Sequence, residues 1–172
     1  MSKLKYLVLL LICGIVYFML AVGSSSDSTS VSSNSDGSGE TTIYHLNEDI
    51  YITKSTGKYR VKFTNIKETK ERNRYSDKEA KRVIVIDYEY ENIDQESDLY
   101  VSDVTNFKLY DKDNNVLETY PVDIKYATSI GKGRKGSASV AYALNNDSNY
   151  IELEYYDNTW NSSPDCKVIF EW

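Results

Sequence analysis

Residues 81–92 form the longest strand pattern of the chain and read Lys-Arg-Val-Ile-Val-Ile-Asp-Tyr-Glu-Tyr-Glu-Asn. The even positions from 84 to 90 are all large and apolar, whereas the odd positions change from valine at 83 and 85 to acids at 87 and 89. Successive side chains of a strand point to opposite faces, so one face should be wholly buried and the other half-buried. We therefore predict a central strand of a β-sandwich that starts under a neighbouring element and ends toward solvent.

Shorter alternating runs on both sides of this strand predict about seven to eight strands in residues 43–172. The runs at 43–46 and 50–53 suit a first strand split between two sheets, and a break in alternation at Asn65-Ile66 suits a bulge. Residues 104–110 and 116–120 flank a polar turn and predict a hairpin. With no convincing helix and only two prolines, the pattern favours an all-β, antiparallel sandwich. A small closed barrel is the alternative.

The N-terminus carries an apolar segment, residues 4–22, that is long enough to cross a bilayer as a helix. Lys3 and Lys5 should stay on the cytoplasmic side. We interpret residues 1–23 as a signal anchor or as a signal peptide cleaved after Gly23. A lipoprotein signal fits poorly, because bulky Ile12 precedes Cys13 and Ser24 stands where the lipid-acceptor cysteine would lie.

Residues 24–42 are rich in serine and glycine and predict a disordered linker, because they hold too few apolar side chains to offset the entropy of ordering.

All three interpretations of the N-terminus, as an anchor, a cleaved signal or a lipoprotein signal, export the remaining chain. The predicted location is therefore the cell membrane, in a single pass with the C-terminal domain extracellular, or the medium if the signal is cleaved.

The exported part is acidic. Lys3 and Lys5 are the only charges in residues 1–22, which leaves 18 basic and 26 acidic side chains and a net charge of −8. Nucleic-acid binding depends on Lys and Arg contacts to phosphate, so we exclude nucleic acid as a partner.

The two cysteines are Cys13, in the apolar segment, and Cys166, so the folded part has no internal disulfide.

The order of these signals carries a family resemblance over about residues 48–172. Its elements are the turn and strand at 57–61, then 66–69, the central strand, Phe107–Asp111, and Ile130-Gly131-Lys132-Gly133 leading into 138–144 and 151–153. Together they resemble the immunoglobulin-like domain of unknown function found in Gram-positive bacterial lipoproteins and membrane-anchored exported proteins. The resemblance implies an immunoglobulin-like sandwich and an exported location, and it offers no catalytic residues to transfer.

Two short motifs suggest ligand chemistry without meeting its requirements. Gly131-x-Gly133-x-x-Gly136 matches a dinucleotide fingerprint, but a strand pattern follows it where the pyrophosphate needs a helix. Asp111-x-Asp113-x-Asn115 opens like a calcium loop. However, Val116 and Val122 occupy the positions where such a loop requires glycine and glutamate. We interpret the first as a basic turn and the second as a hairpin tip, and we predict no cofactor and no metal.

No catalytic constellation emerges from the remaining reactive residues. His45 is the sole histidine and lies at the start of the fold, and Cys166 has only Lys167 as a cationic neighbour. We predict a non-enzymatic domain. The alternative is an exported hydrolase or enzyme inhibitor that uses strand-borne carboxylates.

Tyrosine is the most suggestive residue type, with 16 copies. Six of them fall in turns or on the outward phase of predicted strands, where tyrosine offers contact area at low entropy cost: Tyr100, Tyr110, Tyr120, Tyr126, Tyr150 and Tyr156. We predict that they form a recognition surface for a protein or a cell-wall glycan. Because tyrosine is also a favoured strand residue, surface cover and edge packing are the alternative. The leading hypothesis is an extracellular, membrane-tethered binding domain.

Overall fold

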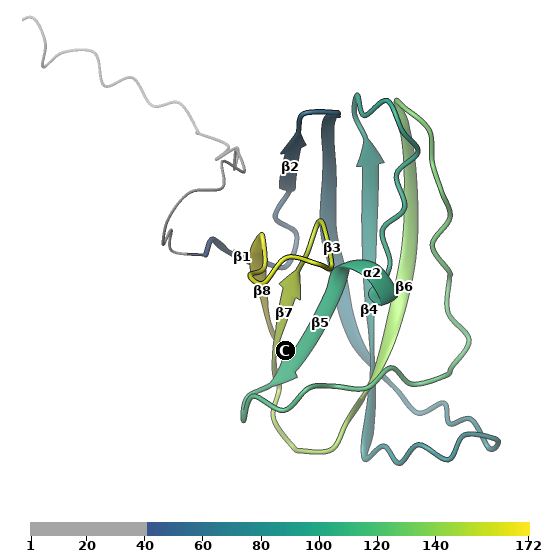
Figure 1. Ribbon diagram of the computed structural model, residues 1–172. Coiled ribbons are helices and arrows are strands. Elements are labelled where there is room, and N and C mark those ends of the chain that lie inside the picture. The colour runs from purple at the N-terminus through teal and green to yellow at the C-terminus, as the bar shows by residue number, and fades with distance from the viewer. Residues whose placement is uncertain (1–40) are drawn as a thin grey trace, which may run out of the picture.

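The computed structural model describes residues 41–172, which fold into two four-stranded β-sheets packed face to face (Figure 1). Sheet A has the order β2 (Ile50–Lys54), β3 (Gly57–Thr69), β4 (Arg82–Asn92) and β6 (Arg134–Leu144). Sheet B has the order β1 (Ile43–His45), β8 (Cys166–Glu171), β7 (Tyr150–Tyr155) and β5 (Phe107–Asp111). The predicted all-β sandwich is confirmed, and the closed-barrel alternative is wrong because the two sheets are separate.

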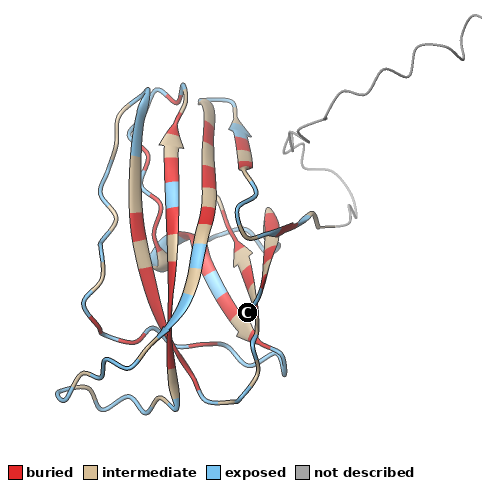
Figure 2. Ribbon diagram, turned by 180° about the vertical axis from the view of Figure 1, so that it is seen from behind, coloured by how far each residue is buried: buried red, intermediate tan, exposed pale blue. Residues whose placement is uncertain are grey.

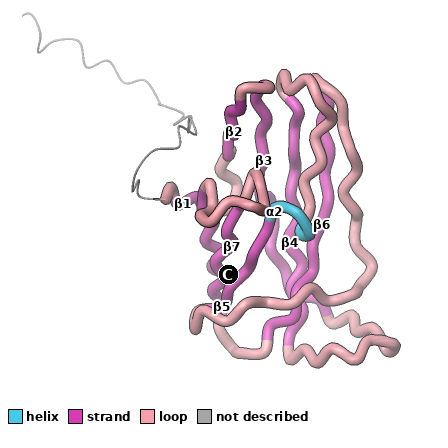
Figure 3. The backbone as a smooth tube through the Cα atoms, viewed as in Figure 1, coloured by secondary structure: helices cyan, strands magenta, loops and turns pink. Residues whose placement is uncertain are grey.

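Loops and the one-turn helix α2 (Asp103–Asn106) complete this part of the chain (Figure 3). No helix within residues 41–172 is long and apolar enough to cross a membrane. The predicted anchor at 1–23 and residues 24–40 of the predicted linker lie outside the described residues.

Strand β4 lies at the centre of sheet A, between β3 and β6 (Figure 2). On its inner face Ile84, Ile86, Tyr88 and Tyr90 are at most 1% exposed. On its outer face Val83 and Val85 are buried, Asp87 is half-buried and Glu89 is exposed. The predicted central strand, with one buried face and one half-buried face, is confirmed.

The first strand is split between the sheets, as the sequence predicts. β1 pairs in parallel with β8 in sheet B, and β2 pairs antiparallel with β3 in sheet A. Asn47 lies between them with φ 68°, in the left-handed region that asparagine tolerates. Its N–H donates to the carbonyl oxygen of Phe63 at 2.8 Å, which fixes the crossing to β3.

The predicted hairpin of 104–110 with 116–120 forms only at its tip. Its first arm contains β5, but Val104 lies in α2. A single bridge, Tyr110 to Val116, joins the second arm to β5, and the Leu117 N–H donates to the Leu109 carbonyl oxygen at 2.8 Å. The chain then leaves sheet B and follows the free edge of β6 (Figure 1), where the Tyr120 N–H donates to the Ala141 carbonyl oxygen at 2.8 Å. We call residues 116–125 the covering segment.

The covering segment leaves the hairpin because the outer face of sheet A needs apolar cover. Tyr120 and Val122 form a second buried cluster with Val83, Val85 and two alanines of β6. Burial of this apolar area outweighs what a longer hairpin ladder would supply. The cluster also confirms that β4 starts beneath a neighbouring element.

The predicted bulge in β3 is confirmed, since the register with β4 shifts between Phe63 and Asn65. One extra residue in a strand moves every later side chain to the opposite face. Asn65 and Lys67 therefore lie on the outer face, with Asn65 directly opposite Asp87. The bulge therefore places polar side chains on the outer face beside Asp87.

Candidate functional site

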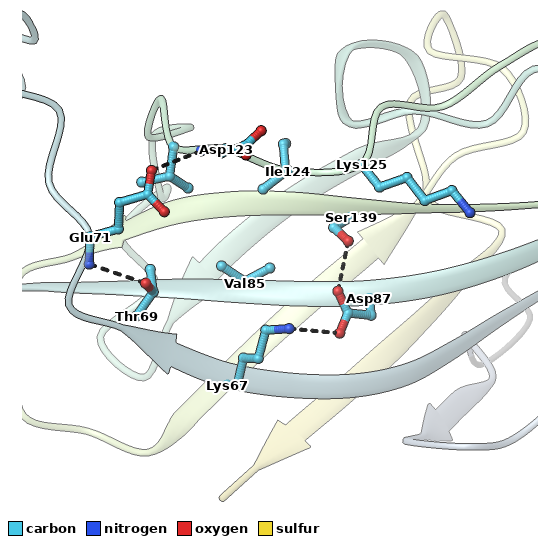
Figure 4. Close-up of a pocket in the computed structure, with 10 residues that line it drawn as sticks. Lys67, Thr69, Glu71, Val85, Asp87, Asp123, Ile124, Lys125 and Ser139 are labelled. Atoms are coloured by element: carbon cyan, nitrogen blue, oxygen red, sulfur yellow. Dashed lines mark hydrogen bonds and ion pairs between the residues drawn. The ribbon is translucent and has the colours of Figure 1, made fainter.

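A hollow of about 520 Å³ opens on the outer face of sheet A, beside the covering segment (Figure 4). Its floor comes from β3, β4 and β6, and one wall comes from the covering segment. We call it the Asp87 hollow, and its lining residues are Lys67, Thr69, Glu71, Val85, Asp87, Val122, Asp123, Ile124, Lys125 and Ser139.

Asp87 is the centre of a hydrogen-bond network in this hollow. The Ser139 hydroxyl donates to Asp87 Oδ1 at 2.7 Å, and Asn65 Nδ2 donates to Oδ2 at 3.0 Å. Lys67 Nζ lies 3.3 Å from the same Oδ2. Burial works against the charged form, but these donors outweigh it and hold the pKa of Asp87 below its usual range.

Two further contacts hold Lys125 and Glu71 of the hollow in place. Lys125 Nζ donates to the Ser137 hydroxyl at 2.5 Å, and the Asp123 N–H donates to Glu71 Oε1 at 3.1 Å. A general acid needs a raised pKa and a transferable proton, and Asp87 has neither. We interpret the network as structural, and it gives the hydrolase alternative no support.

The Asp87 network predicts a pH-dependent contribution to stability. Asp87→Asn is expected to lower the free energy of unfolding by about 1–2 kcal/mol at pH 7, because it removes the charge that three donors face. Since the folded state lowers the pKa of Asp87, the wild-type advantage is complete above the ordinary value of about 3.9 and is lost as the pH falls through the folded-state pKa. Urea unfolding from pH 7 to pH 2.5 measures this loss.

Asp147→Asn is the matched control. The Asp147 carboxylate pairs with Lys81 at 2.7 Å, but its side chain is 81% exposed. Exposed ion pairs contribute little to stability, so this variant should match the wild type at neutral pH. Equal effects of the two substitutions would show that the Asp87 network is not stabilising.

A second candidate surface is the loop of residues 156–165, between β7 and β8. At its tip Trp160 is 91% exposed. The Asn158 side chain accepts the Trp160 N–H at 3.1 Å, and the Asn158 carbonyl accepts the Asn161 N–H at 3.0 Å. The indole is therefore presented on a closed turn. We call residues 156–165 the Trp160 loop.

The base of the Trp160 loop is fixed to both sheets. The Tyr59 hydroxyl of β3 donates to Asp157 Oδ1 at 2.5 Å and lies 2.9 Å from the Tyr155 hydroxyl of β7. Lys54 pairs with the same Asp157 oxygen at 2.6 Å, and the Asp157 N–H donates to Asp165 Oδ2 at 2.6 Å. Burial raises the pKa of Tyr59 and Tyr155, so both stay protonated and able to donate.

The six predicted recognition tyrosines do not form one surface. Tyr126 and Tyr100 are exposed, at 73% and 50%, and Tyr110 and Tyr150 are half-buried on sheet B. Tyr120 and Tyr126 line one hollow beside the covering segment.

Two of the six are buried, so their predicted outward placement is wrong. Tyr120 is 5% exposed because it fills the outer-face cluster with Val83 and Val85. Tyr156 is 4% exposed; its hydroxyl donates to Glu154 Oε2 at 2.7 Å, and Lys108 Nζ lies 4.2 Å from its ring centroid. The burial comes from segments distant in sequence, which alternation alone does not reveal.

The Gly-rich motif and the Asp111 motif are structural elements. Residues 131–133 form a turn, and β6 starts at Arg134 where a helix would be required, so the dinucleotide interpretation is excluded. Asp111 Oδ1 accepts the N–H groups of Asp113 and Asn115, each at 2.9 Å, and Asn146 Nδ2 donates to Oδ2. This carboxylate stabilises the turn, as the hairpin-tip interpretation predicts. Within residues 41–172 no three His, Cys, Asp or Glu side chains are grouped to hold a metal ion.

His45 and Cys166 take no part in a catalytic arrangement of the described residues. His45 is exposed on β1, and its backbone N–H donates to Glu48 Oε2 at 2.8 Å. Cys166 is buried, and burial with the nearby Asp165 charge raises the pKa of its thiol to about 12. A thiol of this kind stays protonated at neutral pH and is a poor nucleophile.

Sequence reasoning missed Trp160. Its signal is compositional: a single indole stands in Asp157-Asn-Thr-Trp-Asn-Ser-Ser-Pro-Asp165, a run of turn-forming residues without alternation. A buried tryptophan normally belongs to a periodic apolar run, so its isolation indicates exposure.

Fold and surface together define a two-sheet β-sandwich domain with hollows and an exposed indole on its outside. The chain belongs to the family described as "Domain of unknown function (DUF5067)", whose model matches residues 25–157. This confirms the part of the sequence resemblance that predicts a domain of unknown function.

One solved structure gives a fold-level comparison. The crystal structure of the yjhA protein from Bacillus subtilis is similar in fold, with a TM-score of 0.52 and 15% identity over 74% of this chain and 98% of that chain. No curated protein matches the chain.

Proposed function

We propose that this chain is a non-enzymatic, membrane-tethered extracellular binding domain with an immunoglobulin-like sandwich. The single observation that carries the binding role is Trp160, 91% exposed on a loop whose base is fixed to both sheets. An exposed indole contributes nothing to a folded core, whereas tryptophan is among the residues that contribute most at interfaces. A fixed loop also loses little entropy on binding.

The tether supports an extracellular location for the partner. The apolar segment 4–22 favours an anchor. The serine- and glycine-rich composition of residues 24–42 is typical of a coil, and a coil of 19 residues has a root-mean-square reach of about 25 Å. The chain enters sheet B at Thr42, whose carbonyl accepts the Lys167 N–H at 3.0 Å, beside the end of the Trp160 loop at Asp165. This geometry therefore favours a partner close to the extracellular surface of the cell membrane, either a protein or a wall glycan.

Capture from the native envelope tests the binding role. The full-length tagged chain is expected to capture a partner from the envelope. Trp160→Ala should lower the affinity for that partner roughly thirtyfold, because removing a central tryptophan costs about 2 kcal/mol. Tyr75→Ala is the control, since Tyr75 is 80% exposed on a different loop. Equal capture by both variants would contradict the role of Trp160.

Protease treatment of intact cells tests the location. We expect the folded domain to be digested from outside without lysis. Digestion that occurs only after lysis would place the domain inside the cell and overturn the proposal.

A further inference from the structure

A second hollow, of about 300 Å³, adjoins the covering segment and shares Val122 and Ile124 with the Asp87 hollow. Its walls include Tyr120, Tyr126 and the charged residues Lys78 and Asp103. We propose that this tyrosine hollow binds an organic cation, an alkylammonium group, with Asp103 as its counter-ion and Tyr126 as an aromatic wall.

Asp103 supplies an uncompensated negative charge. It is half-buried, and the hydrogen bond that the structure gives its carboxylate comes from the neighbouring Val104 N–H, at 3.0 Å. Among the described residues Asp103 makes no ion pair, unlike Asp87 in the other hollow. A carboxylate that is partly removed from water and is paired with no cation favours a ligand that supplies one.

Lys78 does not neutralise this charge, because its own ammonium group is engaged elsewhere. Lys78 Nζ donates to the Thr119 carbonyl oxygen at 2.7 Å and lies 3.7 Å from Glu118 Oε2. Lys78 and Glu118 therefore balance each other at the edge of the hollow. The charge that remains for a ligand is that of Asp103.

The rest of the lining favours an organic cation over a metal ion. The Tyr126 ring is 73% exposed at this hollow, and the negative face of an aromatic ring attracts an ammonium group placed over it. Ile124 and the buried Tyr120 offer apolar surface for an attached alkyl chain. A hard metal ion would need several oxygen ligands, and the hollow provides one carboxylate.

Binding of n-butylammonium to the full-length chain tests the inference. The readout is the ring resonances of ¹³C-labelled tyrosine in detergent micelles, with n-butanol as the uncharged probe of similar size. We expect a saturable shift of the Tyr126 resonance at millimolar n-butylammonium, weakened by added salt, and no such shift with n-butanol.

Substitutions separate the charge from the apolar wall. Asp103→Asn should weaken binding at least fivefold, and Tyr126→Ala should weaken it at least threefold, whereas Asp147→Asn removes an exposed carboxylate elsewhere and should leave it unchanged. An equal response to n-butanol, or unchanged affinity in Asp103→Asn, would overturn the proposal.

This site is independent of partner capture through the Trp160 loop. Trp160→Ala should therefore leave n-butylammonium binding unchanged. Loss of cation binding in Asp103→Asn with intact partner capture would support the tyrosine hollow alone, and the failure of either proposal leaves the other standing.

Discussion

Ile86→Ala is expected to lower the free energy of unfolding by about 2–5 kcal/mol, the range for removing a fully buried aliphatic side chain and leaving a cavity. Ile86 is 0% exposed in the middle of β4, between Ile66 of β3 and Val140 of β6. Ladders to β3 on one side and to β6 on the other hold the β4 backbone in place, so it cannot move into the space. The upper half of the range is therefore expected, measured by chemical denaturation followed by circular dichroism.

Ile43→Ala makes the same chemical change where it should matter little. Ile43 is 56% exposed on the three-residue strand β1. Surface substitutions of this kind usually change stability by less than about 0.5 kcal/mol. If both variants lost the same stability, β4 would not be the centre of the core.

The position of β4 could be predicted because its signal is local. Alternation from Ile84 to Tyr90 identifies the inner face, and the change from Val85 to Asp87 identifies where outer cover ends. The same reasoning predicts the split first strand and the bulge, since each is a break in a two-residue period. Such features depend on residues that are adjacent in sequence.

The covering segment could not be predicted because its partner is distant in sequence. Residues 116–120 have the composition of a hairpin arm, and only the unfilled apolar area over Val83 and Val85 draws the chain to sheet A. The alternation within 116–120 predicts an outward Tyr120, and the residue is instead buried. The choice between two faces is made by packing, which alternation within one segment does not encode.

The two hollows follow from this same tertiary choice. Asp87 gains its donors from β3 and β6 because the bulge turns Asn65 and Lys67 outward and the register brings Ser139 opposite. Asp103 and Tyr126 line one hollow together with residues of the covering segment. Sequence reasoning identified Tyr120 and Tyr126 as candidates, but it could not identify Asp103 as their neighbour.

Gly57→Ala is expected to destabilise the domain by about 2–4 kcal/mol, although it adds a single methyl group. Gly57 has φ 131°, a conformation that residues with a Cβ rarely adopt, which contributes about 1–3 kcal/mol of strain. A Cβ there would also lie 2.6 Å from Gln95 Cα and 2.7 Å from Gln95 N. These are backbone atoms and cannot rotate away.

The clash would also disturb the contact between the β2–β3 turn and residues 93–96. The Glu96 N–H donates to the Thr56 carbonyl at 3.2 Å, and the Ile93 and Asp94 N–H groups share the Lys58 carbonyl, each at 3.1 Å. Moving the turn away from Gln95 would lengthen these bonds, so strain and lost hydrogen bonding act in the same direction.

Gly133→Ala is the control for the same measurement, at a positive-φ glycine without a close neighbour. Gly133 has φ 72°, but nothing lies within 4 Å of an added Cβ. It should therefore show backbone strain alone, about 1–2 kcal/mol. The difference between the two variants then measures the combined cost of the close approach to Gln95 and of the less accessible φ of Gly57. A Gly57→Ala variant no less stable than Gly133→Ala would mean that the β2–β3 turn does not pack against residues 93–96 in solution, and that sheet A is held at this end by its ladders alone.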